Sequence, residues 1–508
     1  MNRKLSIVIA AHNEAKTIGP LVRRLLRWHR RPEVIVIANG CTDGTGNIAK
    51  MAGARVVRFR TRLGPDIGRA IGISLAHGDI LLVLDADVAV TIAQLEPFVR
   101  AVERGADIAL NRYPLFGTKQ FHHPTAVAKH ALNVFADRPD LLAASLTAIP
   151  HAISRRAALQ LGPLAFCVPP VAQARALCSN NLKVEVAAHV PVGRLNRRRG
   201  PHHELTMRRL IIGDCLEGMS VIIQERGSRG GFTDLSRKRH LVTQMPVLPR
   251  SSVDTAVIVP TQGEETLRQV LKELRRLHLD QVRLVLNGTS DTTLPDVKGL
   301  SVQVDHYRDP VGHDVGRAIG CMQVDAAKYF FTDADIILPK AQVQPFLAAL
   351  DEGVDIALNH LDAILAKRRQ IDPPSIVKRF LNIACERPDL GVASLTAVPH
   401  AVSRRTVEQI GAEAFAVPPV AQVKAILAGL KVMAVHPVDV IHTNAARPHL
   451  HDKSVGRPLQ KLIIGDYVEA IHCLQQTLGD RGAFPDNVRR RTIAEQYIVN
   501  HFPMAARS

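Results

Sequence analysis

Hydrophobic and polar positions alternate along the first 90 residues as they do in a chain of strands and helices. Residues 5–11 form a continuous apolar run, which is typical of a strand buried on both faces. Residues 17–28 carry apolar side chains at helical spacing. The same patterns predict further strands at 33–38, 54–59 and 79–87 and helices at 48–52 and 67–76. This alternation favours a parallel α/β sheet covered on both sides.

The second half of the chain repeats the first. The segment Asn39-Gly-Cys-Thr-Asp43 matches Asn287-Gly-Thr-Ser-Asp291, and GPDIGRAIG (64–72) matches GHDVGRAIG (312–320). SLTAIPHAISRR (145–156) has a counterpart at 394–405. Because the order is preserved, we expect a tandem duplication. It predicts a first domain over 1–242, a linker over 243–252 and a second domain over 253–508.

Composition narrows the class of protein. Hydrophobic residues make up 46% of the 508 positions and charged residues 22%, which argues against disorder and against a membrane bundle. The seven cysteines are scattered without a CxxC pair, which favours reduced thiols. The N-terminal segment resembles a buried strand more than a signal peptide, and no apolar run reaches the length of a membrane span. We therefore expect a cytoplasmic protein.

The charge adds an asymmetry. The net charge of +18 belongs to the first half, since residues 1–250 hold 36 basic and 18 acidic residues and residues 251–508 hold 29 of each. This basic excess predicts an anionic partner, which is either the acceptor of a transferred group or the surface of an anionic membrane. In the second case we expect the protein to lie peripherally at the inner face of the membrane. Aromatic residues are only 4%, so the stacking surfaces of nucleic-acid binders are not expected.

The strongest candidate chemistry is a pair of carboxylates at the end of the fourth predicted strand. Asp85 and Asp87 are spaced two apart, and Asp333 and Asp335 repeat them. On an extended segment this spacing points both side chains the same way. Hard oxygen ligands suit Mg²⁺ or Mn²⁺ together with substrate phosphates, whereas the alternative is a solvated polar strand end.

Two other clusters follow neighbouring strands. The loop Asn39–Thr45 is either a turn or a nucleoside-binding loop in which Asp43 contacts base or ribose, and Asn287 and Asp291 are its second copy. Arg69 and Arg317 could hold phosphate through charge-assisted hydrogen bonds or lie on the surface. In an open parallel sheet such clusters gather beyond the carboxyl ends of the strands.

The order of these segments resembles family 2 glycosyltransferases of the GT-A fold, in AAHNE, ANGCTDGT, GPDIGRAIG and GDILLVLDAD. The resemblance implies two tandem GT-A domains with Rossmann-like, mostly parallel sheets that bind a nucleotide-diphosphate sugar. It implies that Asp85 and Asp87 coordinate metal and diphosphate, that Glu14 and Asp43 line the nucleoside pocket, and that Arg69 approaches the phosphates. In the second copy Glu264 is the nearest match to Glu14. Many GT-A enzymes add a histidine as a third metal ligand, which His442 matches, whereas Arg194 is its first-copy counterpart, with His202 and His203 nearby.

The sequence departs from that family at two places. The aspartate that reads the base is replaced by Ala38 and Leu286, which leaves the nucleotide open. Where inverting members carry acidic residues, this chain has VPPVAQ, with prolines at 169, 170, 418 and 419 and glutamines at 173 and 422. Neither residue type can act as a base. The catalytic residues are therefore unknown: the base comes from elsewhere, the transfer is retaining, or catalysis is lost.

The retaining alternative has a looser resemblance behind it. The layout ALNVFADRPDL, SLTAIPHAISRR and VPPVAQARAL is similar to glucosyl-3-phosphoglycerate synthases, which are retaining GT-A enzymes with an anionic acceptor. Two further alternatives remain. A non-catalytic nucleotide-sugar-binding scaffold fits the missing base. A nucleotidyltransferase fits the carboxylates, but this chain has AAHNE where such enzymes usually carry a glycine-rich loop after the first strand.

Overall fold

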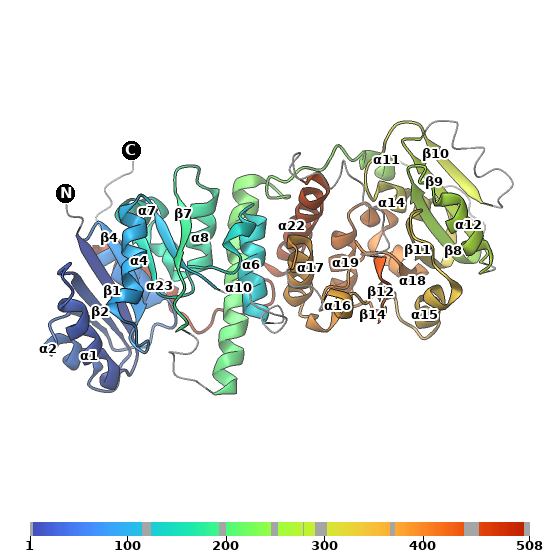
Figure 1. Cartoon of the computed structure of the whole chain (residues 1–508). Coiled ribbons are helices and arrows are strands. Elements are labelled where there is room, and N and C mark those ends of the chain that lie inside the picture. The colour runs from blue at the N-terminus through green and yellow to red at the C-terminus, as the bar shows by residue number, and fades with distance from the viewer. Residues whose placement is uncertain are drawn as a thin grey trace. The chain divides into compact units, whose positions relative to one another are not determined.

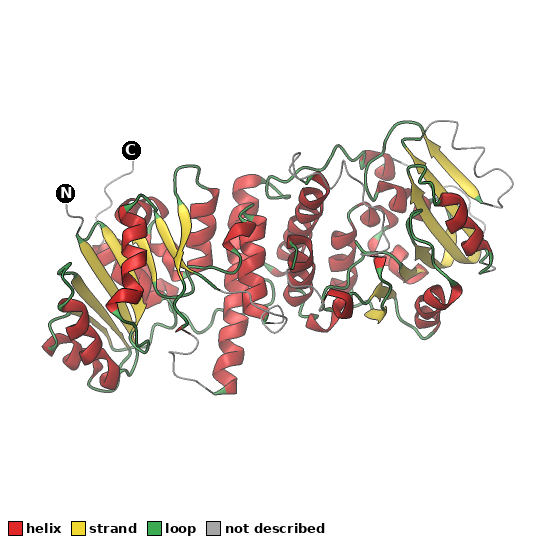
Figure 2. Cartoon of the chain, in the orientation of Figure 1, coloured by secondary structure: helices red, strands yellow, loops and turns green. Residues whose placement is uncertain are grey.

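The computed structural model describes residues 4–113, 123–192, 200–244, 252–277, 279–289, 302–365, 371–440 and 457–501. The chain forms two compact units, which we call unit 1 and unit 2. Unit 1 combines Met1–Arg226 with Leu478–Ser508, and unit 2 is Gly227–Thr477. Figure 1 names the helices and strands, and Figure 2 shows that each unit contains both.

Unit 1 is built on a seven-stranded sheet of order β3-β2-β1-β4-β6-β5-β7. All its neighbouring strands are parallel except where β6 pairs with β4 and β5. Its strands are β1 (Leu5–Ala11), β2 (Glu33–Asn39), β3 (Arg55–Phe59), β4 (Ile80–Asp85), β5 (Ile108–Asn111), β6 (His151–Ser154) and β7 (Val184–Ala188). Its α-helices are α1 (Ala15–Leu26), α2 (Thr45–Met51), α3 (Ile67–Leu75), α4 (Ile92–Glu103), α6 (Pro124–Phe135), α7 (Arg155–Leu161), α8 (Pro169–Cys178), α10 (Pro201–Arg226) and α23 (Arg491–His501).

Unit 2 has a sheet of the same order, β10-β9-β8-β11-β13-β12-β14, in which β13 is antiparallel to its neighbours. Its strands are β8 (Ser252–Thr261), β9 (Gln281–Asn287), β10 (Gln303–Tyr307), β11 (Asp325–Phe331), β12 (Ile356–Asn359), β13 (His400–Ser403) and β14 (Val432–His436). Its helices are α11 (His240–Thr243), α12 (Leu267–Arg275), α14 (Val315–Met322), α15 (Lys340–Asp351), α16 (Asp362–Leu365), α17 (Pro373–Ala384), α18 (Arg404–Ile410), α19 (Pro418–Leu427) and α22 (Pro458–Leu478).

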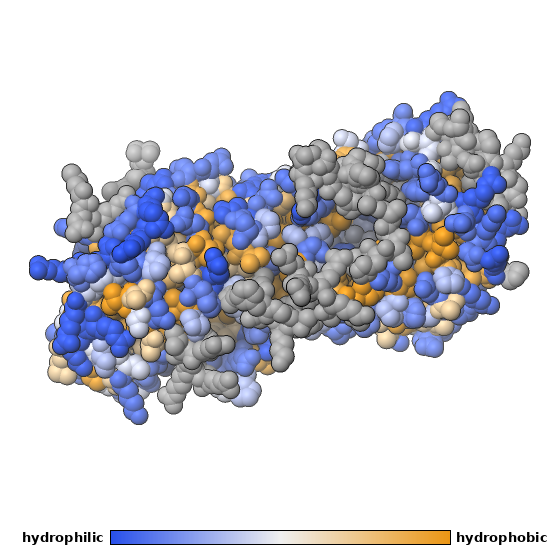
Figure 3. Space-filling model, viewed as in Figure 1, coloured by the Kyte–Doolittle hydropathy of each residue, from blue (hydrophilic) through white to orange (hydrophobic). Residues whose placement is uncertain are grey.

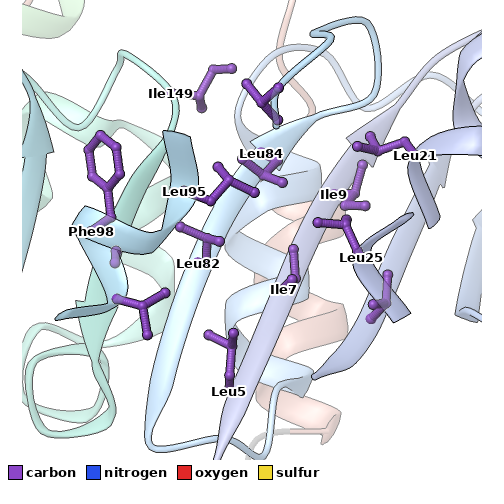
Figure 4. Packing of buried hydrophobic residues seen from close by; sticks show 14 of the residues in the cluster. Leu5, Ile7, Ile9, Leu21, Leu25, Leu82, Leu84, Leu95, Phe98 and Ile149 are labelled. Atoms are coloured by element: carbon purple, nitrogen blue, oxygen red, sulfur yellow. The ribbon is translucent and has the colours of Figure 1, made fainter. Parts of the chain in front are cut away.

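The core of unit 1 explains why the strands are apolar throughout. Side chains of β1 and β4 on one face, Ile7 and Leu82 among them, are buried against Leu21 of α1 and Phe98 of α4 (Figure 4). The other face receives α3. A Cβ at Gly72 would lie 2.2 Å from Val8 Cγ1, so the glycine allows α3 to approach β1 closely. Because both faces are covered, successive residues of β1 are buried without alternation.

The elements expected from the pattern are present near their expected bounds. β1 coincides with the expected 5–11, and β2, β3 and β4 differ from the expectation by one or two residues. The helix expected at 48–52 begins earlier, at Thr45. The α/β class with two mostly parallel sheets is confirmed.

The compact units are divided differently from the domains expected at 1–242 and 253–508. Residues 227–244 belong to unit 2, and the segment from Leu478 onward belongs to unit 1, where Figure 1 places α23 among first-half elements. The physical reason is ion pairing that the sequence pattern does not reveal: Arg489 pairs with Asp214 of α10, and Arg237 pairs with Asp466 of α22. Most of the expected linker lies outside the described residues.

The surface near α1 and α2 is mostly hydrophilic in Figure 3. On α1, Arg23 and Arg24 are exposed, and with Arg27, Trp28 and His29 they line a shallow hollow of about 710 Å³. Part of the basic excess of the first half therefore lies on this helix. Within the described residues no helix combines the length and the apolar character that crossing a membrane requires.

Candidate active site

A cavity of about 690 Å³ lies in unit 1 at the carboxyl ends of β1, β2 and β4. Parallel strands end at the same edge of a sheet, so the polar residues that follow them converge there. The cavity brings together four of the expected residues of the first copy and the second aspartate of the pair. Its polar lining comprises His12, Glu14, Asn39, Arg62, Asp66, Arg69, Asp85, Asp87, Thr147, His203 and Glu204.

The carboxylate pair sits differently from the expected extended segment. β4 ends at Asp85, and Asp87 lies in the turn that follows. Both side chains nevertheless line the cavity. Asp85 accepts hydrogen bonds on both carboxylate oxygens from Arg69, at 3.0 Å from Nε and 2.5 Å from Nη2. The charge of Asp87 also acts on Arg69 and favours its protonated form.

Arg69 is positioned by the first turn of α3, between two carboxylates. Its Nη1 donates to Asp66 Oδ1 at 2.8 Å while Nε and Nη2 hold Asp85. Burial alone would lower the pKa of this guanidinium, but the charges of Asp85 and Asp66 outweigh burial and raise the pKa. Asp66 itself has a φ of 63°, a left-handed conformation that is uncommon outside glycine and that aspartate tolerates better than most residues. Asp66 lies within GPDIGRAIG, but the sequence pattern alone does not indicate that it pairs with Arg69.

The loop after β2 is organised by its own side chains. Asn39 is buried, and its amide donates to Gly64 O and accepts from Leu63 N, so it fixes the loop before α3. Asp43 accepts from Thr45 N at 3.0 Å and from Ala15 N at 3.2 Å. The hydrogen bond from the Thr45 hydroxyl lowers the pKa of Asp43. Asp43 is not among the described residues that line the cavity, whereas Glu14, at the start of α1, does line it.

The long helix α10 supplies a wall that the sequence did not assign. His203, Glu204, Met207, Leu210 and Ile211 of this helix all face the cavity. His203 thereby shares the cavity with Asp85 and Asp87. Arg194, the counterpart of His442, lies outside the described residues.

The VPPVAQ segment forms the start of α8 and is not part of the cavity lining. Gln173 is fully buried: its amide nitrogen donates to Asn133 Oδ1 at 2.6 Å and its oxygen accepts from Leu146 N at 2.9 Å. Gln422 makes the matching bonds to Asn382 and Leu395 in unit 2. These glutamines tie a loop to a helix, which is a structural role.

Unit 2 repeats the central arrangement of charges. Arg317 pairs with Asp314 at 2.8 Å and with Asp333 at 3.2 Å, and Asp314 again has a left-handed φ of 61°. Asn287 holds Gly312 and Val311 as Asn39 holds Gly64 and Leu63. Glu264 instead folds back on its own loop, accepting from Gln262 N and the Thr261 hydroxyl. Asp335 lies in the turn after Asp333, and Asp291 and His442 lie outside the described residues.

The cavity of unit 1 contains the types of side chain that bind a divalent cation. Five carboxylates and two guanidinium groups line the cavity, so an anionic ligand there needs additional positive charge. Among the described residues, no group of three or more His, Cys, Asp or Glu side chains is gathered closely enough to hold a metal ion. Mg²⁺ and Mn²⁺ are commonly bound by one or two carboxylates and completed by substrate phosphates, which this arrangement permits.

A mostly parallel sheet with one antiparallel strand and a carboxylate pair after its central strand defines a protein of the GT-A class. Comparison with known proteins gives its family. The model of glycosyl transferase family 2 matches residues 6–158 and again 256–409, and the chain belongs to this family.

Individual relatives are similar over short segments. The chain is 37% identical over 86 residues to the succinoglycan biosynthesis protein ExoU of Rhizobium meliloti, which is 16% of this chain and 25% of the relative. It is 29% identical over 111 residues to the dodecaprenyl-phosphate galacturonate synthase of Rhizobium johnstonii, 20% of this chain and 33% of the relative. The chain thus spans a quarter to a third of these relatives. The glucosyl-3-phosphoglycerate synthase of Mycobacterium tuberculosis, solved with Mn²⁺, uridine-diphosphate-glucose and phosphoglyceric acid, is 21% identical with a TM-score of 0.35, over 42% of this chain and 79% of that one.

Proposed function

We propose that this protein transfers a sugar from a nucleotide-diphosphate sugar to an acceptor, and that the cavity of unit 1 holds the donor. The observation that carries the proposal is the convergence of Glu14, Arg69, Asp85, Asp87 and His203 on one cavity at the carboxyl edge of the sheet. In open α/β sheets ligands bind at this edge, and the volume is in the range of small-molecule sites.

Asp87 and His203 are the side chains that would hold Mg²⁺ or Mn²⁺, with the donor diphosphate completing the coordination. Asp85 is clamped by Arg69, so its proposed part is to keep the end of β4 in place and to face the donor sugar or ribose. A bound divalent cation would neutralise the charge that develops on the leaving diphosphate. In unit 2 we propose the same roles for Asp333, Asp335 and Arg317, and for His442 as the additional ligand.

The nucleoside end of the donor is proposed to lie near Glu14 and the loop that begins at Asn39. Asn39 acts through the loop it fixes. Asp43 joins the loop to the start of α1, so its proposed contribution is to the shape of this pocket. Asn287, Asp291 and Glu264 are the corresponding residues proposed for the second copy.

The chemistry that best fits the missing base is a retaining transfer. Gln173 is committed to the core and the neighbouring prolines cannot take a proton, so this segment provides no general base. In a retaining transfer the bond from the anomeric carbon to the phosphate oxygen breaks, and the acceptor oxygen bonds on the same face. The acceptor proton passes to the leaving phosphate, so no carboxylate is needed for that step.

The acceptor is proposed to be anionic, free or carried on a membrane lipid. The basic excess of the first half and the exposed arginines of α1 favour such a partner. One relative is named for a dodecaprenyl-phosphate product, which is consistent with a lipid acceptor. We accordingly propose a cytoplasmic enzyme that associates peripherally with the inner face of the membrane.

The test is nucleotide-sugar hydrolysis by the full chain with Mn²⁺, across UDP-, GDP- and TDP-sugars, with NMR detection of the released anomer. Hydrolysis of one donor with retained configuration supports the proposal, and inverted product refutes the retaining step. Absence of hydrolysis together with absence of nucleotide-diphosphate binding in calorimetry would favour the non-catalytic scaffold. Asp140→Asn, at an exposed carboxylate of the same unit, serves as the control for Asp87→Asn.

A further inference from the structure

The two halves of the chain exchange a short basic segment. RGGFTDLSRKR (229–239) follows α10 of the first repeat but belongs to unit 2, and RGAFPDNVRRR (481–491) follows α22 of the second repeat but belongs to unit 1. Both segments lie outside the stretches that match the family model. Their matching residues stand 252 positions apart, as do the residues of α10 and α22 that they contact.

In unit 1 the segment 481–491 is held by buried ion pairs. Arg489 donates to both oxygens of Asp214 on α10, at 2.6 and 2.5 Å, and both side chains are 0–1% exposed. Arg481 and Arg491 bind Glu217, one turn further along α10. Buried charges of this kind need their partners, because removing one leaves the other uncompensated. The segment is therefore an integral part of unit 1.

Arg489 also reaches the cavity. Its Nη2 donates to Asp66 Oδ2 at 2.8 Å, and its Nε donates to Pro65 O at 3.2 Å. A continuous series of charge-assisted hydrogen bonds thus runs from Asp214 through Arg489, Asp66 and Arg69 to Asp85 of the carboxylate pair. Asp66, Arg69 and Asp85 line the cavity. Arg489 is not among the lining residues and contacts Asp66 directly.

The backbone fits as closely as the side chains. Gly64, which has a φ of 89°, lies under the segment: a Cβ there would meet Val488 O at 2.0 Å. Arg490 N donates to Leu63 O at 2.9 Å. The cavity loop 62–66 therefore packs directly against residues 488–490. Asp66, with its left-handed conformation, therefore contacts a segment that lies outside the first repeat.

Unit 2 shows the corresponding helix ion pair and backbone contacts with the repeats reversed, and there Arg237 acts on Asp314 through its charge. Arg237 bonds Asp466 of α22, and Lys238 N donates to Val311 O at 2.8 Å. A Cβ at Gly312 would meet Arg237 Cα at 2.8 Å. The loop before α14, with Asp314, is thus supported by a segment of the first repeat.

We propose that Arg489 is a positioning residue of the first repeat's donor site and Arg237 of the second's, so that each site is completed by the other repeat. The inference rests on the proposed function for its binding readout. It explains why the two repeats stay in one chain: neither site loop keeps its geometry without a segment encoded in the other half.

The binding test uses the full chain with one site disabled and UDP or GDP with Mn²⁺ as calorimetric probes. In the Asp335→Asn background, Arg489→Gln is expected to weaken binding by about 10–100-fold, the usual cost of removing a residue that orients a ligand-binding group. Arg489→Lys is expected to restore part of this loss, whereas Arg490→Gln, at an exposed neighbour, leaves affinity unchanged. In the Asp87→Asn background nucleotide binding reports on the site of unit 2. There we expect Arg237→Gln to weaken binding and Arg489→Gln to leave it unchanged.

Equal effects of Arg489→Gln and Arg490→Gln, or a loss at the second site from Arg489→Gln, would overturn the proposal. A second measurement separates it from the proposed function, because it needs no nucleotide. Hydrogen exchange of residues 63–70 is expected to accelerate in Arg489→Gln, and that of 311–318 in Arg237→Gln. If the wild-type protein binds neither nucleotide, the proposed function fails, but hydrogen exchange still tests the positioning role. Unchanged hydrogen exchange in both variants would refute the positioning role.

Discussion

Arg69 holds Asp85 through both carboxylate oxygens, and Arg317 contacts Asp333 in the equivalent place. This pairing means that the first aspartate of each carboxylate pair is oriented by an arginine of the helix before it. On this ground we propose that Arg69 acts on a donor phosphate indirectly, by orienting Asp85 at the cavity.

The first prediction concerns this pairing. Arg69→Lys replaces a planar, two-pronged donor with a point charge, so at least one hydrogen bond to Asp85 is lost. Hydrogen bonds to charged groups contribute about 1.5–3 kcal/mol, so nucleotide-diphosphate affinity should fall by roughly 10–100-fold in calorimetry. Arg100→Lys, in an exposed i,i+4 pair with Glu96, is the matched control. Equal affinities of Arg69→Lys and Arg100→Lys would contradict the orienting role.

The second prediction separates the two sites. Asp87→Asn keeps size and shape but removes the charge expected to hold the cation, and Asp335→Asn does the same in unit 2. We expect each substitution to lower Mn²⁺-dependent hydrolysis by about 100-fold at its own site, in the range seen when one stabilising group is removed. The double variant should retain none above background. Steady-state rates at several Mn²⁺ concentrations measure this, and full activity in the double variant would refute a metal site at these carboxylates.

The third prediction tests the structural role of Gln173. Gln173→Leu leaves Asn133 Oδ1 and Leu146 N without their side-chain partner in the core. Each buried group left unpaired costs about 1–3 kcal/mol in the free energy of unfolding. Trp28 lies in the core of unit 1, so urea unfolding followed by its fluorescence reports on that unit. Gln422→Leu is the matched control in unit 2. A catalytic role for Gln173 would instead reduce turnover without shifting the urea midpoint.

The fourth prediction concerns acid stability. Burial lowers the pKa of His130 to about 4 and that of His151 to about 3, against 6.5 for the ordinary side chain. The unfolded chain therefore binds protons between pH 6.5 and about 4 that the folded chain does not, and stability falls as pH falls through this window. Each histidine contributes about 1.4 kcal/mol per pH unit there.

Urea unfolding at pH 7, 6 and 5, followed through Trp28, measures this slope. His151→Gln is expected to make the slope shallower, whatever it does to stability at pH 7. A slope identical to that of wild type would mean that His151 titrates alike in both states.

The sequence by itself determined the strands, the helices and the α/β class, because a strand covered on both faces must be apolar throughout. Residues 5–11 illustrate this rule. The carboxylates at the end of a buried strand likewise indicated where the candidate site lies. Repetition of the same motifs predicted two similar halves, and each half contains one match to the family model. These are local patterns, and local patterns are what a sequence displays.

Tertiary structure alone decided which residues meet. His203 of α10 and Asp87 line the same cavity, and Asp43 turns to the start of α1 because Thr45 and Ala15 offer it donors. Arg489 lies against Asp66 although 423 positions separate them. The RGGF and RGAF segments match each other, but only buried ion pairing, which depends on distance in space, determines which unit each one joins.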